Sequence, residues 1–176
     1  MVSAAVVPFT SNSLELSRIV YYAEPPDNVG SSALVHGVTR SSGVAGSFGQ
    51  LVDAVRGRML VVYGRHDIEF LKVEAARRGI ELGEVCYVDV LSWVLSVPSA
   101  RDEAVKRGHF TLDEALAVLL GIEVPQRSFH DPVSDAVHVA LLFMHLVGRL
   151  GDPPVKCYDG RTGSRLRRAL AKLFRL

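Results

Sequence analysis

The sequence predicts an α/β fold in which a mixed β-sheet is flanked by helices. Two β-rich runs open the chain at 2–9 and 17–24, and two buried-strand patterns follow at 59–63 and 84–90, each after a helical pattern. Adjacent β-runs favour a hairpin, whereas strands that alternate with helices favour parallel pairing, so the sheet should be mixed. With 176 residues and 48% apolar content, the chain is long enough to bury one core.

The elements of the first third follow from turn residues and helical spacing. The polar stretch 10–13 separates the two opening runs and predicts a hairpin-like pair, whose second strand ends at Pro25. A short helix is expected over 31–36. Apolar residues then recur at helical spacing over 48–55, which predicts an amphipathic helix ending near Gly57.

The middle of the chain alternates between strand and helix. The apolar run 59–63 has the composition of a buried strand, and a helix is expected over 68–78, where Gly79 provides a C-terminal signal. A second buried strand is expected over 84–90. It leads into a helical stretch at 91–95.

Two capping signals predict the next helices. The segment 111–114 (Thr-Leu-Asp-Glu) is a capping box, which starts a helix running through Leu120. The segment 131–132 (Asp-Pro) combines an N-cap residue with proline at the first helical position, and this helix should run to about Leu150.

The sequence predicts a separate element at the C-terminal end of the chain. After a break at 151–154, a last helix is expected over 163–176, with leucines on one face and basic residues on the other. We therefore expect one domain over 1–150 and a basic amphipathic C-terminal helix, packed on it or extending from it, within 151–176.

The charge of the chain is unevenly distributed. Residues 161–176 hold six of the 20 basic residues and no acidic one, so the rest of the chain, with 14 basic and 19 acidic residues, carries −5. A basic tail on a slightly acidic body favours contact with a polyanion. The residues expected to meet nucleic-acid phosphates are Arg165, Arg168, Lys172 and Arg175.

Composition also bears on location. The longest apolar run, 137–147, contains two histidines and is too short to cross a bilayer, so no membrane contact is expected. Cys86 and Cys157 form no ligand cluster, and Cys86 lies in an apolar strand-like run, where a buried thiol is expected. A soluble cytoplasmic protein is the resulting expectation.

Only two Asn and two Gln are present, which is compatible with a thermophilic source.

The stretch 128–136 carries the strongest chemical signal. It places His130 five residues before Asp135, at the start of an apolar helical run. An imidazole can take a proton and a carboxylate can hold a divalent cation, so this pair suits activation of a water molecule beside a metal ion.

Four segments together resemble the DnaQ-like 3′–5′ exonucleases of the DEDDh type, which have an RNase H-like fold. Residues 36–39 (His-Gly-Val-Thr) are similar to the family's HGIT segment, and residues 60–71 are similar to its second exonuclease motif. Residues 87–91 are similar to its D-T-L strand end. His130 and Asp135 match the third motif, H-x4-D-A, which a long apolar helix follows. The resemblance covers roughly residues 2–150.

The second motif admits two alignments. When Phe70 and Leu71 are aligned with the family's F-L pair, Asp67 takes the place of a metal-binding aspartate. An alternative alignment matches His66 to the motif histidine and leaves Leu71 where the aspartate should be. We prefer the first, because it needs no gap and keeps a carboxylate at the site.

The family's first motif, D-x-E on the first and central strand, is absent. The chain has no aspartate before Asp27, and its only early glutamates are Glu15 and Glu24. Residues 2–26 look most like the family's second and third strands, so the first strand is expected to be missing. A less favoured alignment makes 4–10 the first strand, again without the acidic pair.

The resemblance implies metal-dependent removal of nucleotides from the 3′ end of DNA or RNA. His130 would be the general base, Asp67 and Asp135 would bind Mg²⁺ or Mn²⁺, and single-stranded DNA or RNA would be the partner.

Three explanations of the missing motif stay open. The chain is catalytically impaired and retains nucleic-acid or protein binding; or its true start lies upstream; or other carboxylates such as Glu24 or Asp89, or a partner chain's residues, complete the site. A non-catalytic interaction module is the rival class, and a sheet edge left uncovered would favour a homodimer.

Overall fold

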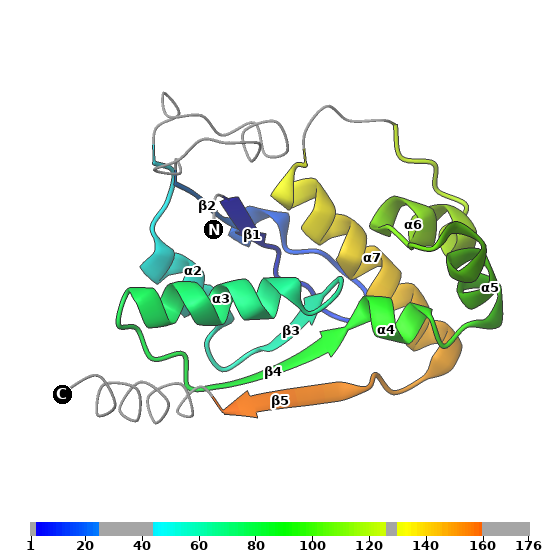
Figure 1. Ribbon diagram of the computed structural model, residues 1–176. Coiled ribbons are helices and arrows are strands. Elements are labelled where there is room, and N and C mark those ends of the chain that lie inside the picture. The colour runs from blue at the N-terminus through cyan, green and yellow to red at the C-terminus, as the bar shows by residue number, and fades with distance from the viewer. Residues whose placement is uncertain (1–2, 25–43, 126–129, 160–176) are drawn as a thin grey trace.

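The computed structural model describes residues 3–24, 44–125 and 130–159. Within these ranges the protein is mixed α/β and contains two small sheets with helices packed around them (Figure 1). The helices expected over 31–36 and 163–176 lie outside the described residues, and so do Arg165, Arg168, Lys172 and Arg175.

The two opening runs form the expected hairpin. Strand β1 (Ser3–Val6) pairs antiparallel with β2 (Val20–Ala23). The expected turn at 10–13 is present, because the Thr10 N–H donates to the Ser13 carbonyl at 2.9 Å. A short 3-10 helix, η1 (Leu16–Arg18), leads into β2, so the second strand is shorter than the run 17–24 predicted.

The second sheet has three strands in the order β3-β4-β5. Strands β3 (Met59–Val62) and β4 (Glu84–Asp89) are parallel and are connected through helix α3 (His66–Arg77). Strand β5 (Val155–Asp159) runs antiparallel to β4, so the sheet is mixed as predicted. Strand β5 itself was not expected from the sequence.

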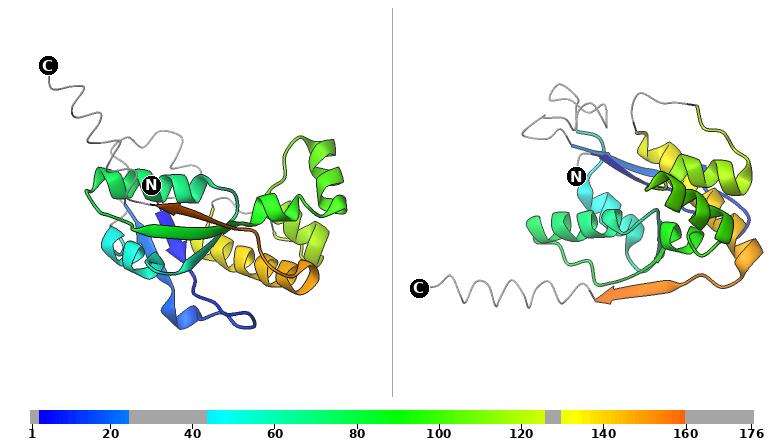
Figure 2. Two further views of the ribbon diagram at one scale, coloured as in Figure 1. Left: turned by 90° about the horizontal axis from the view of Figure 1, so that it is seen from below. Right: turned by 45° about the vertical axis from the view of Figure 1, so that its right-hand side comes forward.

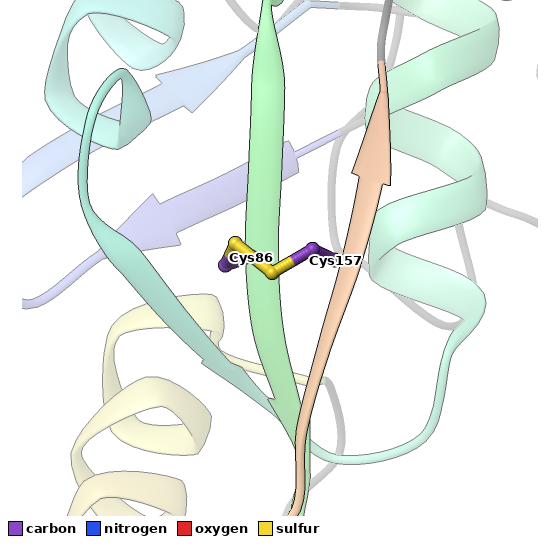
Figure 3. Close-up of a disulfide and its surroundings, with 2 residues drawn as sticks. All are labelled: Cys86 and Cys157. Carbon is purple, nitrogen blue, oxygen red and sulfur yellow. A yellow bond between two sulfur atoms is a disulfide. The ribbon is translucent and has the colours of Figure 1, made fainter.

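The expectation of a buried Cys86 thiol is wrong. Cys86 on β4 and Cys157 on β5 are directly opposite each other in the register, with their Cα atoms 4.0 Å apart, and they form a disulfide (Figure 3). Cys157 is exposed and Cys86 is half-buried. Cross-strand neighbours point to the same face of a sheet, so the antiparallel pairing of β4 with β5 brings the two side chains together.

The remaining helices mostly match the capping and spacing signals. Helix α2 (Phe48–Val55) begins with a capping box, α4 (Val90–Val94) follows β4 directly, and α6 (Leu112–Leu120) begins with the expected capping box at Thr111. Helix α7 (Pro132–Leu150) has Asp131 as its N-cap, as predicted.

Helix α5 (Pro98–Arg107) was not expected. It begins with proline at its first position and ends at Gly108, which has φ +74°. Both are ordinary helix boundary signals. Among its residues only Ala100 is buried, so the helix lacks the apolar stripe by which the other helices were recognised.

The sheet β3-β4-β5 separates two layers of apolar side chains. Val61 and Val88 face the cluster that α7, α6 and α4 form, whereas Leu60 and Val85 face the cluster that α2 and α3 form with the hairpin. Figure 2 shows α3 on one side of β4 and α7 on the other. The alternation along the strands therefore places helices on both faces of the sheet.

A polar network attaches the hairpin to α3. Arg78, just after α3, pairs with Glu24 beside β2 and with Glu74 at 3.4 Å. The Tyr22 hydroxyl donates to the Glu24 carboxylate. Burial, together with this hydrogen bond to Glu24, raises the pKa of Tyr22 to about 12.

By length and composition alone, α7 could cross a membrane, since its 19 residues contain a window with mean hydropathy 1.4. This helix is longer than the apolar run 137–147 on which the sequence expectation rested. In the fold, its side chains Leu142 and Leu146 are fully buried in the core cluster with α4 and α6.

Candidate functional site

The starts of α3 and α7 carry the two aspartates that were predicted to bind a metal ion. Asp67 lies in the first turn of α3, directly after β3, and Asp135 lies in the first turn of α7. The two carboxylates are close enough that the charge of Asp135 raises the pKa of Asp67. Asp67 and Asp135, which lie far apart in the sequence, therefore interact electrostatically, and each has a histidine beside it: His66 precedes Asp67, and His130 contacts Asp135.

The N-cap residue Asp131 determines the geometry of the first turn of α7. The Asp131 carboxylate accepts the Val133 N–H at 3.1 Å, and the Asp135 N–H donates to the Asp131 carbonyl at 2.9 Å. These bonds fix the first turn and direct Asp135 toward the residue before the cap. His130 Nδ1 lies 3.4 Å from Asp135 Oδ2, so the predicted base and the predicted metal ligand are neighbours.

Asp67 has an altered protonation equilibrium. Burial of its carboxyl group is the main cause that raises its pKa, and the negative charge of Asp135 adds to this, while His66 acts in the opposite direction. Asp67 as a whole residue is exposed. Protein atoms crowded around a carboxylate favour its neutral form.

Asp89 is not part of the site, but its hydrogen bonds hold the turn that precedes Asp67. This buried residue ends β4, and its carboxylate accepts the Gly64 N–H at 3.1 Å and both the N–H and the hydroxyl of Ser92, at 3.3 and 2.6 Å. Gly64 has φ +82° and begins the turn from β3 into α3. Asp89 therefore fixes the turn that leads to Asp67.

The described residues contain no group of three His, Cys, Asp or Glu side chains placed to hold a metal ion. Asp67 and Asp135 provide two carboxylates, whereas Mg²⁺ requires near-octahedral oxygen coordination and a two-metal centre requires several bridging carboxylates. Of the replacements considered, Glu24 pairs with Arg78 and Asp89 is occupied by Gly64 and Ser92. The described residues thus do not fit a two-metal centre.

Comparison of the chain with protein-family models, with curated proteins and with solved structures found no match. The assignment of this site therefore depends on its own geometry.

The raised pKa of Asp67 predicts a pH dependence of stability. Folded protein holds the Asp67 proton more tightly than unfolded protein does, so the contribution of Asp67 to the free energy of unfolding decreases as pH rises above about 4. The substitution Asp67→Asn removes this contribution. We expect the variant to gain stability relative to the unaltered protein as pH rises from below about 4 through the raised pKa of Asp67.

Urea unfolding at several pH values measures this difference. Asp102→Asn on α5 is the matched control, because Asp102 is exposed and lies away from the site. A stability difference for Asp67→Asn that stays constant with pH, or moves in the opposite direction, would contradict the desolvation of Asp67.

Proposed function

We propose that this protein is an RNase H-like domain of the DEDDh exonuclease type, with impaired nuclease activity and retained binding of single-stranded DNA or RNA. The observation that carries the proposal is the contact of His130 with Asp135 at the start of α7, together with the effect of the Asp135 charge on Asp67 at the start of α3. The resemblance implied this combination for residues that lie far apart in the sequence.

The sheet arrangement supports the same assignment. The family's first strand is central, and its loss would divide the sheet into two parts. The described strands do form two separate sheets, β1-β2 and β3-β4-β5, while both β1 and β3 pack against α7.

Without a two-metal centre, the catalytic step left to this site is general base catalysis by His130, with Asp135 as its partner. When Asp135 accepts the Nδ1 proton of His130, it holds the imidazole in the tautomer whose Nε2 can accept a proton from water. General base catalysis of this kind supplies only part of the acceleration that phosphodiester hydrolysis requires. Since the described carboxylates do not fit a two-metal centre, weak or absent turnover is the expected result.

The second candidate is a non-catalytic interaction module on the same fold. The incomplete ligand set favours it, and so do the strand edges, because β1 and β3 each pair with a single strand among the described residues. Unpaired edges are templates for another chain, so a homodimer is the partner proposed for this case.

A 3′-end degradation assay tests the nuclease assignment. Single-stranded DNA and RNA are incubated with Mn²⁺ and the protein, its Asp135→Ala variant, or the exposed-site control Asp102→Ala. We expect slow degradation that Asp135→Ala abolishes and Asp102→Ala leaves unchanged. Equal rates for all three proteins would overturn the assignment of Asp135.

Salt-dependent binding to the same oligonucleotides separates the two candidates. The proposed function predicts binding that weakens steeply as salt increases, because phosphate contacts release counterions. A protein that neither degrades nor binds the oligonucleotides, and that elutes as a dimer, would be an interaction module instead.

A further inference from the structure

A pocket of about 480 Å³ lies between the outer edge of β2 and helix α2, formed by elements other than those that carry Asp67 and Asp135. Its volume is within the range of small-molecule sites. The residues that line it are Pro8, Arg18, Ile19, Val20, Tyr21, Gln50, Asp53, Ala54 and Arg58.

The strand at this edge offers a backbone donor. Ala23 exchanges both of its backbone hydrogen bonds with Ala45, on the side of β2 that faces away from β1. Because the direction of the hydrogen bonds alternates along an antiparallel strand, the N–H of Tyr21 also points away from β1. Tyr21 lines the pocket, and no acceptor for this N–H is seen in the described part of the chain.

The charged side chains of the pocket are mainly cationic. Arg58 is exposed, follows the turn at Gly57 (φ +69°), and has no ion pair among the described residues. Arg18 on the other side pairs with Glu15 at 2.7 Å. Asp53 is the single carboxylate in the lining, and it pairs with Arg56 at 3.2 Å.

The cationic donors of the pocket outnumber its charged acceptors, because its one carboxylate, Asp53, pairs with Arg56. Two guanidinium groups and a backbone N–H line an open space of small-molecule size, next to the side-chain amide of Gln50, whose oxygen accepts the Ser47 N–H. Arginine binds phosphate oxygens in a planar, two-pronged geometry, and backbone N–H groups add to such sites. We propose that this pocket binds a phosphate monoester of about the size of a nucleoside monophosphate, a function beyond the nuclease-type site.

NMR titration of the full chain with AMP, inorganic phosphate and adenosine tests the proposal. We expect AMP to shift the amide signals of Tyr21, Gln50 and Arg58 saturably, inorganic phosphate to shift the same signals more weakly, and adenosine to leave them unchanged. The substitution Arg58→Gln should weaken AMP binding about tenfold or more. The control Arg149→Gln, at the exposed end of α7, should leave it unchanged.

Three outcomes would overturn the proposal. They are the absence of saturable shifts at millimolar AMP, equal weakening by both arginine variants, and shifts confined to residues 161–176, where the basic residues would bind any polyanion. A 5′-phosphorylated oligonucleotide distinguishes the source of the phosphate. If it displaces AMP and its unphosphorylated counterpart does not, the pocket takes a chain end; if neither displaces AMP, it takes the free nucleotide.

Discussion

Reduction of the Cys86–Cys157 disulfide is expected to lower the free energy of unfolding by about 4 kcal/mol. The bond closes a loop with a sequence separation of 71 residues. Cross-linking so long a loop removes many conformations from the unfolded chain, and their return on reduction favours unfolding. Urea unfolding with and without a dithiol reductant measures the difference, with the protein kept oxidised or fully reduced throughout.

The double substitution Cys86→Ser with Cys157→Ser is the matched control. Its stability should equal that of the reduced protein, and the reductant should have no effect on it. The exposure of Cys157 predicts that the bond is reduced in the folded state, without prior unfolding. Free thiols titrated before any reductant is added would show that the bond does not form, and unfolding curves that do not change on reduction would show that it does not stabilise the fold.

Neither strand β5 nor the disulfide could be predicted from this sequence. The five residues of β5 follow two prolines, and those from Val155 to Cys157 are exposed, so they show no alternation between buried and exposed positions. Two cysteines in a chain of this length also give no spacing pattern from which pairing can be deduced. Only the antiparallel register of β4 and β5 places Cys86 opposite Cys157.

The central elements were predictable because local signals and packing agree there. Helix α7 combines an N-cap, a proline at its first position and a continuous apolar face, and its start agrees with the sequence prediction. The same signals located His130 and Asp135. The pocket beside α2 gave no such signal, because Arg18 and Arg58 are ordinary surface residues in the sequence and line one pocket only when β2 folds beside α2.

Asp89→Ala is expected to lower the free energy of unfolding by about 3 kcal/mol. The substitution removes the side-chain cap of α4 and leaves the Gly64 N–H without its acceptor in a buried position. An unsatisfied buried donor costs more than the net gain of a typical hydrogen bond, so the loss should exceed that of an exposed cap. Urea unfolding measures the effect, with Asp102→Ala as the surface control.

Asp89→Asn separates the hydrogen bonds from the charge. Its side-chain carbonyl can still accept the N–H groups of Gly64 and Ser92, so we expect a loss of about 1 kcal/mol. A second readout concerns the site, because Gly64 begins the turn that leads to Asp67. If Asp89 fixes this turn, NMR signals of the first turn of α3 should shift in Asp89→Ala and much less in Asp89→Asn. Equal stability of Asp89→Ala and the unaltered protein would mean that water replaces the carboxylate, and the turn before Asp67 would then be held by the backbone alone.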